Sequence, residues 1–185
     1  MDVVWLQGHL EPQQPALLAK TQAMSKLIDT TVQVVRRIST ELRPGILDLG
    51  LVATIEWQLQ EFQTRTGIES ILISPAAETT LNDNSSTAAF RILQEILTNV
   101  VRHAQATRLE VMLEENDKFL TLRVHDNGRG MTESEIQSPK SIGLLGMQER
   151  ARLQAGEVHF QGRPGRGTTV TVRLPLVVAA DGGSK

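Results

Sequence analysis

The chain has an ordinary globular composition and almost no net charge. It has 185 residues, 40% of them hydrophobic and 22% charged, with a formal net charge of −2. That length fits one domain with an appendage, and the charge gives no electrostatic reason to expect nucleic acid or an anionic membrane as a partner. The lack of cysteine excludes disulfides and thiolate metal sites. An aromatic content of 3% argues against a protein that stacks single-stranded bases.

No apolar run in the sequence approaches the length needed to cross a bilayer. Met1-Asp-Val-Val-Trp5 also lacks a basic leader. We therefore expect a cytoplasmic setting and no membrane contact by this chain. A membrane anchor elsewhere in a longer parent protein is compatible with that expectation.

The N-terminal residues have a helical pattern. Residues 1–10 are expected to form a short helical stretch, which a proline-containing break follows. Between residues 16 and 42, apolar side chains recur at close to heptad spacing, so we expect one long helix that seeks a partner helix. An amphipathic helix packed on its own domain is equally compatible with the pattern. Pro44 and Gly45 are expected to end this helix.

The rest of the chain alternates between helical and strand patterns. The expected helices are 51–66 with Gly67 as its C-terminal cap, a helix that Ser85 or Ser86 caps and that runs to about His103, and 147–155. The expected strands are 68–73, 109–113, 120–124, 158–160 and 170–174, the second and third forming a hairpin. Residues 130–142 are expected to form a mobile loop and 179–185 a disordered tail. Three helices and about five strands predict a two-layer α/β sandwich with a mixed sheet.

Two polar segments have the residue types of a nucleotide site. The first, Glu95-Ile-Leu-Thr-Asn99-Val-Val-Arg-His103, has a helical pattern that places Glu95 and Asn99 on one face. The second, Asp126-Asn-Gly-Arg-Gly130, ends a strand pattern with glycines that permit a tight turn and a close approach to the backbone. Together they offer a base, a metal-binding amide and a carboxylate that can hold a purine. Each segment alone also fits a solvated helix face or a plain turn.

Two further glycine segments follow in order, and the whole set resembles a known family. They are Ser141-Ile-Gly-Leu-Leu-Gly-Met-Gln-Glu-Arg150 and Gly165-Arg-Gly-Thr-Thr-Val170. From Glu95 to Leu174 the chain resembles the ATP-binding domain of sensor histidine kinases, in the superfamily shared with gyrase, the heat-shock chaperone ATPase and the mismatch-repair ATPase. The segments are similar to its N box, its two glycine boxes and its closing Gly-x-Gly-Thr element. Upstream, residues 42–51 resemble the end of the dimerisation helix in the nitrate-sensor-type subfamily.

The resemblance implies a role for each candidate residue. Glu95 is expected to act as general base or to orient the attacking group at the γ-phosphate of ATP, and Asn99 to supply an oxygen to Mg²⁺. Asp126 is expected to accept a hydrogen bond from the adenine amino group, assisted by Thr168 or Thr169, whose register the sequence leaves open. A glycine-rich stretch is expected to enter the helix at Met147 and to present its N–H groups to phosphate. The other expected nucleotide contacts are Arg102, His103, Gly128, Gly130, Gly143, Leu144 and Gly146.

The resemblance also implies an organisation and a function. Residues 1–45 are expected to be part of a dimerisation hairpin and 46–178 the ATP-binding catalytic domain. The full-length protein is expected to form a homodimer through its N-terminal helices and to serve a response regulator. The γ-phosphoryl group would pass to a histidine outside this chain, because His9 is followed by Leu10 rather than by an acidic residue. The alternatives are a nucleotide-binding regulator of the anti-sigma-factor kinase type and a non-catalytic ATP sensor.

Overall fold

The computed structural model describes residues 17, 20–21, 23–27, 45–74, 78–138 and 141–176. The chain divides into two compact units, Met1–Arg43 and Pro44–Lys185. The described residues of the first unit are helical. The remainder of the helix expected over 16–42, and the tail expected over 179–185, lie outside the described residues. The dimerisation role of the first unit therefore stays a prediction.

The second unit contains a mixed five-stranded sheet in the order β1-β2-β3-β5-β4. β1 pairs with β2 in parallel, and the three other pairings are antiparallel. This confirms the predicted mixed sheet and the predicted hairpin of β2 and β3. The strands are β1 Glu69–Ile73, β2 Arg108–Glu115, β3 Phe119–Asp126, β4 Glu157–Gly162 and β5 Thr168–Pro175.

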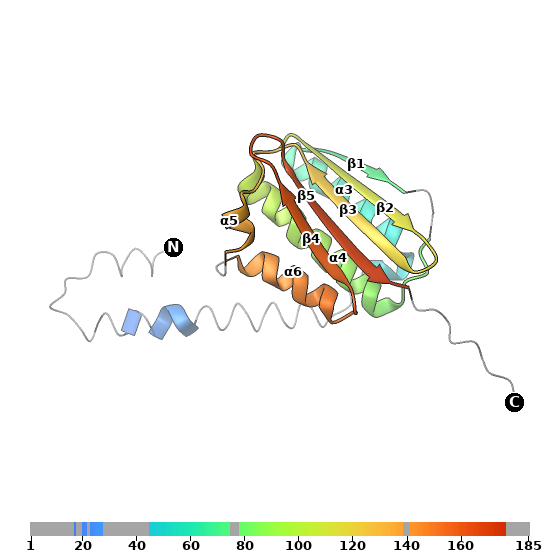
Figure 1. The fold of residues 1–185 in the computed structure, drawn as a ribbon, viewed down its shortest axis with the longest axis horizontal. Coiled ribbons are helices and arrows are strands. Elements are labelled where there is room, and N and C mark those ends of the chain that lie inside the picture. The colour runs from blue at the N-terminus through green and yellow to red at the C-terminus, as the bar shows by residue number, and fades with distance from the viewer. Residues whose placement is uncertain are drawn as a thin grey trace, which may run out of the picture. The chain divides into compact units, whose positions relative to one another are not determined.

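Helices cover one face of this sheet (Figure 1). α3 packs beside β1, α4 against β3 and β5, and α6 beside β4 and β5. The longer helices are α3 Leu51–Thr66, α4 Asp83–Asn99 and α6 Ile142–Arg152, and the short ones are the 3₁₀ helix η1 Gly45–Leu49, the π-helical turn η2 Val100–Ala104 and α5 Glu133–Ile136. Gly67 ends α3 in the left-handed conformation, with φ 73°, and its N–H donates to the Gln63 carbonyl, as the sequence predicted.

Period-two alternation along the strands builds the core. Alternate residues of β3, among them Leu122 and Val124, point to the helix-covered face and are at most 1% exposed. They belong to one buried cluster with Ile92 and Leu93 of α4, which are fully buried. Burial of each such side chain contributes about 1.5–3 kcal/mol. The buried row of β3 continues to its last residue, Asp126, and the core therefore fixes where that carboxylate lies.

Two predicted helix starts are wrong. Asn82, not Ser85 or Ser86, caps α4: its side-chain oxygen accepts from the Ser85 N–H at 2.8 Å. Several residues from Asn82 to Ser86 are of types that can cap a helix. Ser85 is buried within the first turn of α4, so it is not the residue that caps the helix. The other helix, α6, begins at Ile142 rather than at Met147, so the second glycine box forms its first turns instead of preceding it.

The segment expected to be a loop over 130–142 contains the short helix α5. Thr132 and Glu135 form a capping box, in which the Thr132 hydroxyl accepts from the Glu135 N–H and the Glu135 carboxylate accepts from the Thr132 N–H. Two polar side chains thereby stabilise one helical turn that has no buried residue.

Candidate nucleotide-binding site

Glu95 and Asn99 lie on one face of α4, and α6 passes directly in front of them. Gly143, in the first turn of α6, lies against the Glu95 side chain. A Cβ atom at this position would overlap the Glu95 Oε1 atom and lie 3.7 Å from the Asn99 Nδ2 atom. The N box and the second glycine box are therefore adjacent in space, and the missing side chain at Gly143 permits the approach.

Asp126 lies at the end of β3, beneath the helices, and is 5% exposed. Its Oδ1 atom accepts a hydrogen bond from the Gly128 N–H at 2.9 Å, which closes the turn that follows the strand. A carboxylate accepts at about four lone-pair positions, so this bond leaves capacity for a ligand donor. The buried location of the carboxylate suits a role in which it holds a polar ring edge.

The sheet register separates the two candidate threonines. Thr168 lies opposite Asp126 in the β3–β5 ladder and is buried on the same, helix-covered face. Thr169 points to the other face, where its hydroxyl lies 3.0 Å from the Nδ1 atom of His125. Thr168 is thus the threonine that shares a face with the buried carboxylate.

Glycines allow the first glycine box and the closing turn to pack backbone against backbone. A Cβ atom on Gly128 would overlap the Ala104 carbonyl, and one on Gly167 would overlap the Asp126 carbonyl. Gly130 and Gly167 also have positive φ angles, 76° and 81°, which side-chain-bearing residues rarely adopt. These two turns therefore pack around the end of β3, where Asp126 lies.

α4 passes into a π-helical turn, η2, before the chain reverses at Gln105. π-helical turns are rare and occur often at functional sites. Arg102 and His103 lie in this turn, and both side chains are exposed. Backbone carbonyls of the same turn contact the first glycine box, since the Arg129 N–H donates to the Ala104 carbonyl at 2.8 Å.

The start of α6 retains the features expected of a phosphate site, although the helix begins earlier than predicted. The N–H groups of Gly143 and Leu144 lie in its first turn, where backbone donors have no intrahelical acceptor. The Leu144 side chain is 7% exposed and belongs to the core, so only its backbone can meet a ligand. Gly146 follows one turn later and is half-buried, close to Arg150.

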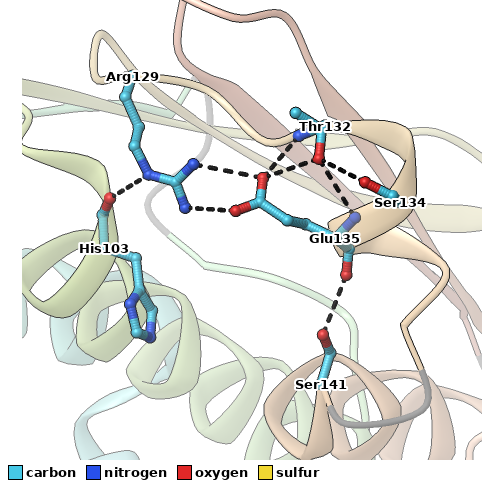
Figure 2. A network of polar contacts seen from close by, with 6 residues as sticks. All are labelled: His103, Arg129, Thr132, Ser134, Glu135 and Ser141. Atoms are coloured by element: carbon cyan, nitrogen blue, oxygen red, sulfur yellow. Dashed lines mark hydrogen bonds and ion pairs between the residues drawn. The ribbon is translucent and has the colours of Figure 1, made fainter.

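Arg129 and Glu135 form an ion pair beside this site that the sequence reasoning missed. The Arg129 Nη2 atom donates to the Glu135 Oε1 atom at 2.8 Å, and its Nε atom donates to the His103 carbonyl at 2.8 Å (Figure 2). The hydrogen bond from Arg129 is the main cause that lowers the pKa of Glu135 to about 2, and the bonds from Thr132 add to it. The same pairing raises the pKa of Arg129. The sequence feature that could have indicated an ordered Glu135 is the Thr-x-x-Glu spacing of the capping box.

The sequence matches a family model and is similar to sensor kinases. Residues 84–178 match the family described as histidine kinase-, DNA gyrase B-, and HSP90-like ATPase. The chain is 34% identical over 154 residues to the oxygen sensor histidine kinase NreB of Staphylococcus carnosus, covering 83% of this chain and 43% of that protein. It is 31% identical over 160 residues to the signal transduction histidine-protein kinase/phosphatase DegS of Brevibacillus brevis, covering 86% and 41%. The chain thus spans less than half the length of either relative.

Solved structures show the same fold. The histidine kinase domain of the blue-light activated histidine kinase from Erythrobacter litoralis EL346 superposes with a TM-score of 0.62 at 16% identity, covering 94% of this chain and 90% of that one. The Acinetobacter baumannii histidine kinase AdeS gives a TM-score of 0.57 at 13% identity, covering 93% and 89%. A buried carboxylate, glycine turns and a glycine-led helix on this fold define a nucleotide-binding domain. The chain belongs to the histidine kinase-, gyrase- and HSP90-like ATPase family.

Membrane spans and metal clusters are both missing from the described residues. Across the parts of the chain that the structure describes, every helix is too short or too polar to span a bilayer. Within those same residues, His, Asp and Glu side chains do not gather in groups of three or more that could hold a metal ion.

Proposed function

We propose that this chain is the ATP-binding catalytic region of a two-component sensor histidine kinase, which passes the γ-phosphoryl group of ATP to a histidine outside these residues. The observation that carries the proposal is the position of Gly143 close to the Glu95 and Asn99 side chains, because it brings the helix start that suits phosphate beside a carboxylate and an amide. The similarity to NreB and DegS, both named as histidine kinases, supports the assignment of the acceptor as histidine.

Asp126 and Thr168 are assigned to the adenine end of the site. Asp126 is buried, and its carboxylate can only accept hydrogen bonds, so it selects the adenine amino group over the guanine carbonyl oxygen. Thr168 shares its face of the sheet, which favours Thr168 over Thr169 for the assisting hydroxyl. Gly128 and Gly130 are assigned to the turn that shapes this end of the site, because their missing side chains make room for the backbone carbonyls of Ala104 and Arg163.

Glu95, Asn99 and the first turn of α6 are assigned to the phosphate end. The free N–H groups of Gly143 and Leu144 and the helix dipole suit an anion. Asn99 fits Mg²⁺, because this ion accepts few protein oxygens and completes its shell with phosphates and water. When bound, the ion neutralises charge on the phosphates. Glu95 orients the attacking nitrogen or accepts its proton, while Arg102 and His103 are exposed beside the site and can donate to phosphate.

The remaining assignments concern the parent protein. Residues 1–45 are proposed to contribute part of a dimerisation hairpin, and residues 46–178 to form the catalytic domain. A homodimer through the N-terminal helices and transfer to a response regulator follow from the kinase assignment, as does a cytoplasmic location. NreB and DegS are both named as histidine kinases, and their similarity over most of this chain supports the kinase assignment from which this organisation follows.

A test of the base pocket is the change of Asp126 to Asn, which removes the charge and keeps the shape. Hydrogen bonds to charged groups contribute about 1.5–3 kcal/mol, so we expect ATP to bind about tenfold to 150-fold more weakly by calorimetry. Glu110→Gln is the matched control, because Glu110 pairs with His125 in the sheet and lies outside the site. ATP affinity at the parent level in the Asp126→Asn variant would contradict the assignment. Tight ATP binding by the parent without transfer to a separately supplied dimerisation segment would instead support a nucleotide-binding regulator.

A further inference from the structure

Arg129 bridges three backbone segments around the site. Its N–H donates to the Ala104 carbonyl at 2.8 Å, and its Nε atom donates to the neighbouring carbonyl of His103, also at 2.8 Å. Its own carbonyl accepts from the Gly165 N–H at 2.7 Å. The end of the N box helix, the first glycine box and the closing turn are therefore joined through one residue. These bonds fix the guanidinium in one place.

The guanidinium then reaches the segment of residues 131–138, called here the lid segment. It donates to both Glu135 oxygens, at 2.8 and 3.3 Å (Figure 2). Glu135 in turn accepts from the Thr132 N–H at 2.8 Å, and its carbonyl accepts from the Ser141 hydroxyl at 3.0 Å. Ser141 is the N-cap residue of α6, the helix that carries Gly143. The contacts thus connect the first glycine box, on one side of the site, with the start of α6 on the other.

This network is the polar attachment of α5, beside the packing of Met131 from the same segment against the core. The helix has four residues and no buried one, so apolar burial contributes little to its position. An isolated exposed ion pair stabilises little. Here, however, the arginine is held by backbone bonds on one side and the carboxylate by a capping box on the other. Because both partners are pre-oriented, little side-chain entropy remains to be lost when they pair.

We propose that Arg129 is a positioning residue that latches the lid segment over the nucleotide site through Glu135. The inference rests on the proposed function only in taking the site as a nucleotide site. The latch sets how fast the segment opens, and with it how fast nucleotide enters and product leaves. Lid motions of this kind limit turnover in many enzymes.

The first test uses the nucleotide-free 185-residue chain and amide hydrogen exchange. We expect the Arg129→Met and Glu135→Gln variants to exchange about threefold to tenfold faster over the lid segment, and the double variant to match the single ones, because both remove the same contact. Glu157→Gln is the matched control, since Glu157 makes a similarly exposed pair with Arg173 on β5. Parent-level exchange in either variant, or additive effects in the double variant, would overturn the latch.

The second test measures nucleotide kinetics by stopped flow with a fluorescent ATP analogue. We expect both variants to raise the association and dissociation rates together, about threefold to tenfold, with a much smaller change in affinity. Arg129→Lys keeps the charge but loses the two-pronged geometry, so it should lie between parent and Met variant. A guanidinium that binds phosphate directly would give the opposite pattern. Arg129→Met would then weaken binding, while Glu135→Gln, which frees the arginine, would tighten it.

These two tests separate the latch from the proposed function. If the parent binds no ATP, the nucleotide assignment fails, while the exchange result still decides whether Arg129 holds the lid segment. If the parent binds ATP and the exchange rates do not respond, the latch fails and the nucleotide assignment stands.

Discussion

Replacement of Gly143 by Ala tests the contact between the N box and the second glycine box most directly. Gly143 lies inside α6 and does not have a positive φ, so alanine suits its backbone. Alanine in place of glycine within a helix stabilises by about 1 kcal/mol. The added Cβ, however, would overlap the Glu95 Oε1 atom. The substitution therefore perturbs the proposed catalytic carboxylate and little else.

The size of the effect follows from what the Cβ meets. Its distances to the Glu95 Cδ atom, 3.4 Å, and to the Asn99 Nδ2 atom, 3.7 Å, are tolerable, so only the carboxylate oxygen must move. A rotation of about 30° from a preferred rotamer costs roughly 0.5–1.5 kcal/mol. This cost offsets the gain in helix propensity, and the melting temperature should change little. A displacement of about 1 Å at a reacting group can lower the rate by about 100-fold.

The assay therefore compares stability, binding and chemistry in one variant. We expect Gly143→Ala to melt within a few degrees of the parent, to bind ATP with at most modest loss, and to hydrolyse labelled ATP about tenfold to 100-fold more slowly with enzyme in excess. Gln148→Ala is the control, because Gln148 is exposed on the same helix and also gains helix propensity.

Parent-level hydrolysis in the Gly143→Ala variant, with an unchanged melting temperature, would refute the reasoning. It would mean that Gly143 and Glu95 are not in contact in the active state, or that Glu95 does not act in the reaction. A variant that unfolds at much lower temperature would refute the claim that only the carboxylate has to move.

Three further outcomes are expected. Asn99→Ala should weaken the binding of Mg-ATP far more than the binding of metal-free ATP. Glu95→Gln should leave ATP binding intact and slow phosphoryl transfer to a supplied phosphoacceptor domain. Equal losses of binding in both variants would count against these roles. The Glu135 carboxyl should titrate near 2 by carbon NMR, and its pKa should return toward the ordinary value of 4.5 in Arg129→Met. Because the pKa is depressed in the folded state, the stabilisation of the fold by this ion pair is present above about pH 4.5 and is lost as the pH falls toward 2. An unshifted titration in the parent would disprove the pairing. The chain incubated alone with γ-labelled ATP should acquire no acid-labile phosphate, since phosphoryl transfer needs an acceptor held in line; a labelled band that His9→Ala abolishes would show that this histidine is an acceptor.

The sequence predicted most of the sheet because alternation is a local property of each strand. In β3, Leu120, Leu122 and Val124 alternate with polar residues, and the same alternation in β2 made their pairing as a hairpin evident. The motif residues were placed correctly on α4 and at the end of β3 for the same reason. Glu95 and Asn99 needed only a helix, and Asp126 only a strand that ends in a glycine turn.

What the sequence did not predict depends on contacts between distant segments. Glycines usually break helices, so Gly143 and Gly146 suggested a loop before α6. They lie within the helix instead, and at Gly143 the approach of Glu95 on α4 leaves no room for a side chain. The choice between Thr168 and Thr169 required the β3–β5 register. No sequence pattern marks Arg129 as a contact residue. Its partners are backbone carbonyls and one residue of a segment that was expected to be a loop.

The π-helical turn at the end of α4 makes the backbone contacts around this site sensitive to chain length. Its contacts with the first glycine box use the carbonyls of His103 and Ala104, which any residue at these positions supplies. A π turn accommodates one more residue than an α turn, so deleting a residue between 100 and 104 would turn both carbonyls away from Arg129. Among related sequences, insertions and deletions in this turn should therefore be rare.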